Sequence, residues 1–506
     1  MPCWTLFLPL AMRPRPPPLD LRPHDFSPVA RHEIVGIDNV LQTVDEVVDW
    51  LQHSQVYLAA NAPLEPGILL VGPPGTGKTF VSRYIATVSN SHMINVQDVL
   101  SDGTLTGNGM VRDLFAGARR LHEQSGKPVI LFWDEFNEYV RRESGSRFFG
   151  EASLSAQLIS ELDGVKGRPL GILLIACTND EDEIPNSILR PGRIGLKIEF
   201  TSPNQEGKIQ LFQHYLDLYP HANAIDVPGL AGLLDDNCSA AGIEEVVASA
   251  WRQAVRQSLP NYTEAQISPE IIQSTVLDQI VGPITTRKAP ASPEDLRRVA
   301  IHEMGHALLA HLLGLKLRLV TLRNSMNGFG QTMISEDDSP LSTFRHSLTD
   351  LITACGGRAM EEHMSIPVSM GHQGDNARIS AILFDLIDEQ GAIFPISFKT
   401  VMQARQYDDQ SQSYLSILDK YALFLSNQSL KLAHEILNLI ETDIVESLAQ
   451  ALIRNHTLTG PQFAELATPF SSRLPTPDDV ENTIRRGLDV LLGGNRTFLP
   501  PSGWEK

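Results

Sequence analysis

Residues 68–79 read ILLVGPPGTGKT, an apolar run followed directly by a glycine-rich loop. The loop fits the pattern GxxxxGK[ST], in which backbone N–H groups close around phosphate oxygens. Its lysine would reach the β and γ phosphates, its threonine would bind Mg²⁺, and the helix that begins here would add its positive dipole end. The stretch therefore predicts a strand, a phosphate-binding loop and a helix. The predicted nucleotide-binding residues of the loop are Gly72, Pro73, Pro74, Gly75, Thr76, Gly77, Lys78 and Thr79.

The residues around this loop alternate between strand and helix patterns. From residue 34 to about 200, the apolar runs GILLVG, PVILFW, GILLIA and LKIEF are separated by longer helical patterns. Such alternation favours a three-layer α/β unit with a mainly parallel sheet. Residues 205–258 show only helical periodicity and predict a small helical lid.

Polar residues follow two of the other apolar runs. Asp134 and Glu135 end the run VILFW, where the aspartate can hold the Mg²⁺ shell and the glutamate can orient and deprotonate an attacking water. Asn179 ends the run GILLIACTND, where its amide can hydrogen-bond the γ-phosphate or the water. The alternative is a set of solvated side chains at strand ends, which is plausible alone but weak beside the phosphate loop.

The segment NSILRPGR contains two arginines, Arg190 and Arg193. Either can supply positive charge to a nucleotide held by a neighbouring subunit, as arginine fingers do. Taken singly, such arginines are usually surface residues. Their order after the other motifs favours the functional interpretation.

The motifs GPPGTGKT, FWDE, ACTND and LRPGR, followed by a helical lid, together resemble the AAA+ ATPases over roughly residues 30–260. The resemblance implies ATP with Mg²⁺ as cofactor. It also implies a homo-oligomeric ring, usually a hexamer, with nucleotides at the subunit interfaces. His214 stands where related proteins place a histidine near the nucleotide.

A linker-like stretch, VGPITTRKAPASPED, begins at Val281 and ends in a helix start signal. Ser292 can cap a helix, Pro293 suits its first position, and Asp295 can complete a capping box. The pattern predicts a helix from about Pro293 to residue 313 that ends at Gly314.

HEMGH, residues 302–306, lies in the middle of that helix. His302 and His306 would share one face one turn apart, a spacing that can hold zinc, with Glu303 free to take a proton from a zinc-activated water. His311 would point to the opposite side and is expected to be structural. Two core histidines are the alternative, but burying them with Glu303 in an apolar helix would be costly without a partner.

A catalytic zinc site needs a third protein ligand. The metzincin spacing fails because the required glycine and histidine positions hold Leu309 and Leu312. Several downstream residues remain, and chemistry alone leaves the choice open. The candidates are Glu361, Glu362, His363, His372 and Asp375.

An AAA+ module followed by HEMGH, then GGRAMEE at residues 356–362 and GHQGDNARIS from Gly371, resembles the FtsH family of ATP-dependent zinc proteases over about residues 30–470. The resemblance implies one zinc ion per chain and Asp375 as its third ligand. Glu361 and Glu362 would then be supporting residues, with His372 as a rival ligand.

Three departures from the family pattern concern the ATP-driven machinery. The stretch VLSDGTLTGNGMVRDLF has no aromatic residue before Phe115, which weakens a grip by stacking on an unfolded chain. Leu196, beside Lys197, replaces a second arginine, and residues 162–165 read LDGV where the family has DGF. We therefore expect intact peptidase chemistry with altered or weak translocation.

Composition excludes some partners. Forty-one Lys and Arg against sixty Asp and Glu give a net charge of −19, so nucleic acid is a poor candidate partner. The four cysteines form no CxxC pair, which favours a reducing compartment. Members of the family usually begin with membrane-spanning helices and this sequence shows none, so we expect a cytoplasmic chain that a partner can recruit to a membrane.

The sequence thus predicts an α/β three-layer AAA+ domain with a helical lid, followed by a mainly α-helical zinc metallopeptidase domain. The leading functional prediction is that the protein is an ATP-dependent zinc metalloendopeptidase that acts on polypeptides. One alternative is an ATP-regulated chaperone or scaffold, and another is a peptidase that acts on loosely folded chains without pulling. The predicted segments are a Pro-rich start (1–25), the α/β domain (26–202), the lid (203–280), a linker (281–292), the peptidase domain (293–470) and a C-terminal tail (471–506).

Overall fold

The structure is a computed structural model, and its described residues form two compact units. The first unit contains described residues up to Val227 and from Asn237 to Ser268, and the second contains Pro228–Asp236 and the residues from Pro269 onward. The described residues are 21–62, 64–101, 109–141, 154–163, 171–284, 292–325, 328–335, 343–367, 373–386 and 412–493.

A five-stranded parallel sheet organises the first unit, in the order β2-β3-β4-β1-β5. Its central strands are buried on both faces, which explains their unbroken apolar runs. The strands are β1 (Gly67–Val71), β2 (His92–Asn95), β3 (Val129–Trp133), β4 (Ile172–Thr178) and β5 (Ile194–Glu199).

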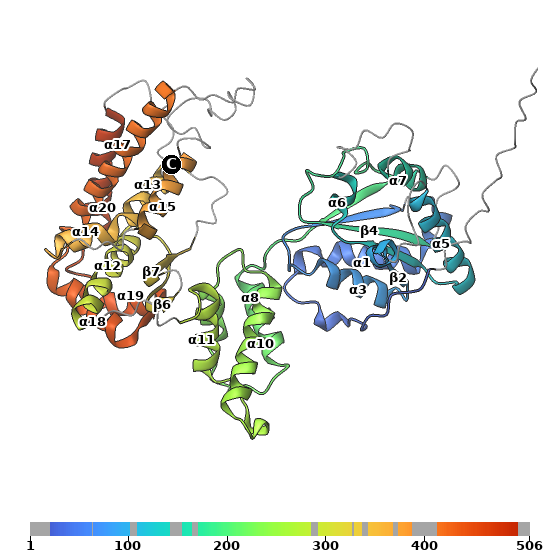
Figure 1. Ribbon diagram of the computed structural model, residues 1–506, viewed down its shortest axis with the longest axis horizontal. Coiled ribbons are helices and arrows are strands. Elements are labelled where there is room, and N and C mark those ends of the chain that lie inside the picture. The colour runs from blue at the N-terminus through green and yellow to red at the C-terminus, as the bar shows by residue number, and fades with distance from the viewer. Residues whose placement is uncertain are drawn as a thin grey trace, which may run out of the picture. The chain divides into compact units, whose positions relative to one another are not determined.

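Helices cover both faces of this sheet (Figure 1). Helices α1 and α3 pack in one apolar cluster, and α5, α6 and α7 pack in another on the opposite face. This arrangement confirms the predicted three-layer α/β fold. The helices are α1 (Asp38–Gln52), α2 (Ser54–Ala59), α3 (Lys78–Val88), α4 (Val96–Ser101), α5 (Met110–Ser125), α6 (Phe136–Arg141) and α7 (Leu154–Leu162), with a short 3₁₀ helix η1 (Arg31–Glu33) before them.

Two helices of the predicted lid, α8 (Gln205–Leu216) and α10 (Ala240–Gln257), pack against each other in the first unit. A 3₁₀ helix, η3 (Tyr262–Glu264), follows them. The other two, α9 (Val227–Leu233) and α11 (Pro269–Ile280), cluster with the second unit instead.

Arginine contacts tie both helices to the second unit, while the lid bounds of residues 203–280 remain a prediction. Arg318 donates to the Leu233 carbonyl at the end of α9, and Arg323 forms an ion pair with Asp278 of α11. Both arginines lie on a strand of the second unit, so they hold these two helices there.

The second unit is built around α12 (Pro293–Leu312), which starts and ends where its signals predict. Ser292 Oγ accepts from the Asp295 backbone N–H at 3.1 Å, and Gly314 follows the helix with a φ of +74°. Every residue from Ala300 to Ala310 is buried, because other elements surround α12. The helix carrying HEMGH is therefore the core of its unit.

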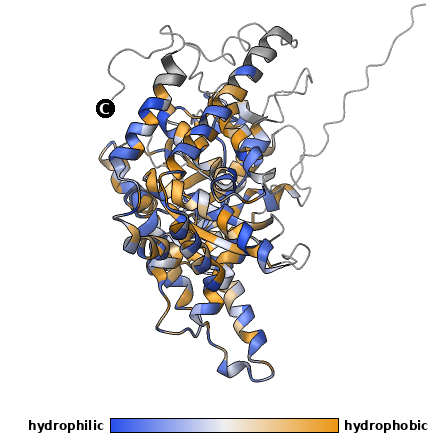
Figure 2. Cartoon of the chain, turned by 90° about the vertical axis from the view of Figure 1, so that its left-hand side faces the viewer, coloured by the Kyte–Doolittle hydropathy of each residue, from blue (hydrophilic) through white to orange (hydrophobic). Residues whose placement is uncertain are grey.

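The elements around α12 are mainly helical, as predicted. Figure 2 shows that many helices of the chain carry both hydrophobic and hydrophilic residues. A small antiparallel sheet, in the order β7-β6-β8, packs beside α12. The elements are β6 (Leu317–Ser325), β7 (Gly328–Ile334), β8 (Thr457–Thr459), α13 (Phe344–Ala354), α14 (Gly356–His363), α15 (Gln373–Phe384), α17 (Gln412–Leu437), α18 (Thr442–Asn455), α19 (Gly460–Ala467), η6 (Thr468–Phe470) and α20 (Pro477–Gly493).

Helix α20 lies in the segment predicted as a tail from residue 471. Its Val480 and Ile484 are 3% and 2% exposed and belong to the main apolar cluster of the second unit. Although Pro and Gly are frequent in this part of the chain, the apolar spacing of α20 is sufficient for packing against α17.

Helices α12 and α14 approach each other until their backbones touch. A Cβ atom placed on Gly305 would lie 2.2 Å from the Gly356 carbonyl oxygen and 2.6 Å from Met360 Cβ. A Cβ on Gly356 would lie 2.8 Å from the Gly305 carbonyl oxygen. The approach therefore requires glycine on both helices.

We expect Gly305→Ala to lower the free energy of unfolding of the second unit by about 1–3 kcal/mol, because the new methyl group must push α14 away. Gly374→Ala, at a helical position where a Cβ meets nothing within 4 Å, is the matched control. The control should be neutral or slightly stabilising. Thermal unfolding of both variants checks this, and equal midpoints would contradict it.

Candidate functional site

The phosphate loop of residues 72–77 joins β1 to α3 at the carboxyl edge of the sheet. Gly72 has a φ of +151°, and a Cβ atom there would lie 2.1 Å from the Phe200 carbonyl oxygen. Gly75 and Gly77 have φ values of +76° and +98°, in the left-handed region that favours glycine. Glycine at these positions is thus a backbone requirement of the loop.

Lys78 lies folded onto this loop. Its Nζ donates to the carbonyl oxygens of Gly72 at 2.5 Å and Pro73 at 2.9 Å, and to Asn179 Oδ1 at 2.9 Å. Burial lowers the pKa of Lys78, while Cys177 and Asp134 act in the opposite direction. The structure therefore brings together the predicted lysine and the predicted asparagine.

The ends of β3 and β4 place the other polar residues at the same edge. Asp134 Oδ1 accepts from the Glu135 backbone N–H at 3.0 Å, and the Gln97 side chain donates to the Asp134 carbonyl at 3.1 Å. Glu135 has a φ of +47°, an uncommon value for a residue other than glycine, and its side chain is exposed. Its backbone conformation marks it as a candidate functional residue.

Three further predicted residues are Thr76 and Thr79 at the phosphate loop and His214 on α8. Thr79 is exposed in the first turn of α3, and Thr76 Oγ1 donates to the Pro73 carbonyl at 2.8 Å. His214 lies on α8, with its ring centre 5.2 Å from that of Tyr215. Its predicted place beside the nucleotide remains a prediction.

Arg193 is held within its own chain. Its Nε and Nη2 donate to the two carboxylate oxygens of Asp163 at 2.5 and 2.8 Å, and its Nη1 donates to the Ser187 carbonyl. This bonding lowers the pKa of Asp163. Lys197 pairs with Glu181 and Glu199, whereas Arg190 is exposed. Of the two arginines predicted to act on a neighbouring subunit, Arg193 thus has a partner within its own chain, and Arg190 lies at the surface of the described part of the chain.

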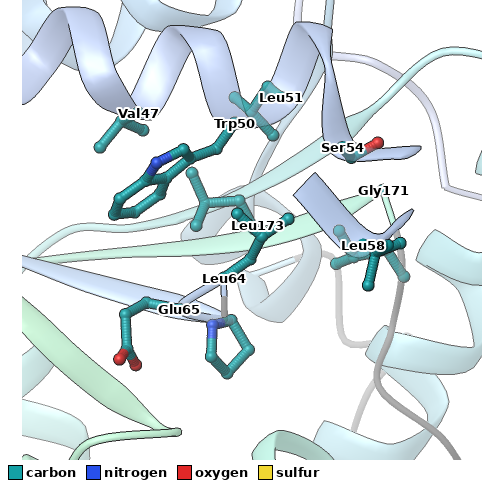
Figure 3. Close-up of a pocket in the computed structure, with 11 residues that line it drawn as sticks. Val47, Trp50, Leu51, Ser54, Leu58, Leu64, Glu65, Gly171 and Leu173 are labelled. Carbon is teal, nitrogen blue, oxygen red and sulfur yellow. The ribbon is translucent and has the colours of Figure 1, made fainter. Parts of the chain in front are cut away.

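A separate apolar cavity of about 60 Å³ lies between α1, α2 and the amino ends of β1 and β4. Figure 3 shows Trp50, Leu58, Leu64 and Leu173 around it. The phosphate loop lies at the opposite edge of the sheet. Since small-molecule sites usually occupy about 300–1,000 Å³, this cavity is too small for a nucleotide.

His302, His306 and Asp375 converge in the second unit, with one ligand atom from each lying within 4.8 Å of the others. The two Nε2 atoms are 3.3 Å apart. Asp375, in the first turn of α15, places Oδ2 3.1 Å from His302 Nε2 and Oδ1 3.4 Å from His306 Nε2. Among the candidates left open by the sequence, the structure brings Asp375 to the two histidines.

The outer nitrogens of both histidines have acceptors. His302 Nδ1 lies 3.1 Å from Glu361 Oε1, and His306 Nδ1 lies 2.8 Å from the Thr353 carbonyl oxygen. When each Nδ1 of a neutral imidazole donates to its acceptor, the Nε2 lone pairs face each other and the Asp375 carboxylate, and only a proton or a cation between them relieves the repulsion. A cation among them would remove this repulsion, so the donor set fits zinc.

The same contacts shift the pKa values of the cluster. Burial lowers the pKa of His302, but hydrogen bonds with Asp375 and Glu361 outweigh it and raise the pKa to about 10. Burial acts to raise the pKa of Asp375, yet hydrogen bonds from His302 and His306 hold it well below its usual range. The cluster thus favours positive charge at its centre.

Two known families match the two units. The ATPase family associated with various cellular activities (AAA) matches residues 68–202, and peptidase family M41 matches residues 290–466. The ATP-dependent zinc metalloprotease FtsH 2 of Symbiobacterium thermophilum is 30% identical over 459 residues, which cover 86% of this chain and 74% of that protein. The chain belongs to the FtsH family.

Two other relatives extend the match. FtsH of Thermobaculum terrenum is 28% identical over 461 residues, covering 86% of this chain and 68% of its own. The YME1 homolog of Caenorhabditis elegans is 28% identical over 499 residues, covering 94% of this chain and 66% of its own. Zinc and ATP with Mg²⁺ are the cofactors that FtsH-family membership implies. In the described part of the chain, no helix has the length and apolar character to cross a membrane.

The glycine pair in GGRAMEE has a physical reason in this FtsH-family chain. Gly356 touches the backbone of α12, and a Cβ atom on Gly357 would lie 2.2 Å from His302 Nε2. Glycine at both positions lets α14 lie against the ring of the zinc-site histidine. Glu361, on the same helix, then reaches His302 Nδ1.

We expect Glu361→Gln to weaken zinc binding about 10- to 100-fold, because the buried carboxylate that fixes the His302 tautomer is lost. Competition with a chelator of known zinc affinity measures this. Glu362→Gln on the same helix is the control, since Glu362 pairs with Arg358 and His434 instead. Equal zinc affinity in the two variants would contradict the expectation.

The remaining candidates lie elsewhere. His363 contacts Asn438 Oδ1 and the Ile440 carbonyl, and His311 packs its ring against Phe463. These contacts are with α19 and with the turn that follows α17, not with the zinc cluster. His372 and residues 102–108 of the predicted substrate-gripping loop lie outside the described residues.

Sequence reasoning missed the residues that support the zinc cluster from other elements. Thr353 contributes only a backbone carbonyl, so no side-chain pattern marks it. Thr332, on β7, donates to Glu303 Oε2 at 2.7 Å. No sequence pattern near either residue marks it as functional, because only the packing of its element against α12 brings it to the site.

Proposed function

We propose that this chain is an ATP-dependent zinc metalloendopeptidase that cleaves polypeptides. One observation carries the proposal: the ligand atoms of His302, His306 and Asp375 converge beside a buried glutamate, Glu303, which is 6% exposed. The same chain carries a complete phosphate loop. ATP hydrolysis and peptide hydrolysis are thus assigned to different units.

Zinc, when bound to the three side chains, supplies Lewis-acid activation of a water and of the scissile carbonyl. Glu303 accepts the proton of that water and delivers it to the leaving amine. Burial raises the pKa of Glu303, although His306 and His302 act to lower it. The raised pKa makes its carboxylate a stronger proton acceptor.

Polypeptide is the substrate class that suits the surroundings of Glu303. β7, which contacts Glu303 through Thr332, is an outer strand of its sheet. An extended peptide can add to such an edge by main-chain hydrogen bonds, which places its backbone beside the glutamate.

In the first unit, Lys78 and Thr79 would hold the phosphates and Mg²⁺, with Asp134 in the metal shell. Glu135 would orient the attacking water and Asn179 the γ-phosphate. In a hexameric ring, Arg193 would have to leave Asp163 to reach a neighbour's nucleotide. Weak translocation is consistent with this pairing and with Leu196 in place of a second arginine.

Zinc quantification combined with digestion of an unfolded protein tests the proposal. We expect about one zinc per chain, ATP-stimulated digestion of unfolded casein, and loss of digestion after chelation. ATP hydrolysis with no zinc and no chelator-sensitive cleavage would instead indicate an ATP-regulated chaperone or scaffold. Equal digestion with and without ATP would indicate a peptidase that acts on its substrate without ATP-driven translocation.

The cytoplasmic location and recruitment by a membrane partner remain predictions. Fractionation of cells that express the full chain tests both, with the chain expected in the supernatant unless a partner is present.

A further inference from the structure

Glu303 lies between two elements rather than on one. Its side chain leaves α12 and meets β7, where Thr332 Oγ1 donates to Oε2 at 2.7 Å. The Thr332 hydroxyl also lies 3.2 Å from the Glu303 backbone carbonyl oxygen, a longer contact. The shorter contact, to a charged acceptor, is the stronger hydrogen bond.

The other carboxylate oxygen faces a second residue of the same strand. Gly330 has a φ of +81°, and a Cβ atom there would lie 2.7 Å from Glu303 Oε1 and 2.5 Å from Val299 Cγ1. Gly330 therefore gives β7 the room to lie against both Glu303 and the preceding turn of α12. Any side chain at this position would separate the strand from the helix.

We propose that β7 positions the Glu303 carboxylate for proton transfer, with Thr332 as the positioning residue and Gly330 as the spacer. This inference rests on the proposed function of Glu303. Thr332 and Gly330 are two residues apart in the strand, so both face α12, and each meets one oxygen. With Oε2 bound by the Thr332 hydroxyl and Oε1 lying against Gly330, the strand fixes the orientation of the carboxylate that accepts the proton of the reacting water.

A merely structural role makes a different prediction. If Thr332 only satisfies a buried carboxylate, its loss would lower stability and leave turnover unchanged in the folded fraction. A positioning role lowers kcat, because the carboxylate rotates away from its productive orientation, and leaves KM nearly unchanged.

The test compares Thr332→Val, which keeps the shape and removes the hydroxyl, with Thr332→Ser, which keeps the hydroxyl. Both are measured in the full, zinc-loaded chain on a quenched-fluorescent peptide derived from casein. We expect kcat to fall roughly 10- to 100-fold in the Val variant and less than about 3-fold in the Ser variant. Zinc content should equal that of the unsubstituted chain in both.

A readout besides turnover is the affinity for acetyl-leucine hydroxamate, whose proton Glu303 would accept when the hydroxamate binds to zinc held by His302, His306 and Asp375. We expect weaker binding in the Val variant and unchanged binding in the Ser variant. If the Val variant does not fold, Thr332→Ala replaces it. Unchanged kcat and hydroxamate affinity in the folded variant without the hydroxyl would overturn the proposal.

A different result would refute the proposed function of Glu303. Cleavage that persists in Glu303→Gln refutes the role of Glu303 itself. Cleavage that is lost in Glu303→Gln but retained in Thr332→Val leaves the proposed function standing and refutes only the positioning by β7.

Discussion

Replacing Glu303 by Gln should reduce proteolysis by roughly 10²- to 10⁴-fold, the usual contribution of a general base. The amide has nearly the shape of the carboxylate and can still accept from Thr332, but it cannot take a proton. ATP hydrolysis and zinc content should remain, because the three ligating side chains and the phosphate loop are unchanged. Digestion of unfolded casein, ATPase rate and zinc content are measured on the same preparation.

Glu294→Gln is the control for this substitution. Glu294 lies in the first turn of the same helix, with 72% of its side chain exposed, and pairs only at the surface with Arg298. Its variant should digest casein as the unsubstituted chain does. Proteolysis that survives in Glu303→Gln would remove the basis for a glutamate-driven peptidase.

The second large effect is expected for Lys78→Ala, which should abolish detectable ATP hydrolysis. Lys78 Nζ is held by two loop carbonyls and by Asn179, so it lies where the β and γ phosphates would bind. Its loss removes the charge that opposes the phosphate oxygens. Zinc content and cleavage of short peptides should persist, since they depend on the second unit.

Lys127→Ala serves as the matched lysine control, because the half-buried Lys127 lies away from the phosphate loop and its ammonium donates to Asn90 Oδ1. ATPase rate and binding of a fluorescent ATP analogue check both variants. ATP hydrolysis at the normal rate in Lys78→Ala would contradict the assignment of the loop. Loss of short-peptide cleavage in the same variant would show that the two activities cannot be separated.

Sequence reasoning succeeded where a function is encoded in neighbouring residues. The phosphate loop, the helix start at Ser292 and the spacing of HEMGH are local patterns, and the structure confirms the three-layer fold and the helix that they predict. Asp375 lies more than seventy positions beyond His302, and only a family resemblance selected it from the candidates. The structure then placed it at the histidines.

The contacts that sequence reasoning missed all depend on how elements pack. The bond from Thr332 to Glu303 needs β7 beside α12, and the bond from His306 to Thr353 needs the end of α13. The ion pair of Arg193 with Asp163 joins positions thirty residues apart. No periodicity or spacing rule predicts such contacts, because each is set by tertiary structure.

The backbone contact between Gly305 and Gly356 has a consequence for protein engineering. It sets the separation of α12 and α14, and Glu361 reaches His302 only at that separation. A zinc centre transplanted into another scaffold would therefore need the glycines of both helices as well as the three ligands. In a library of such grafts, the position that corresponds to Gly305 should accept few residues other than glycine.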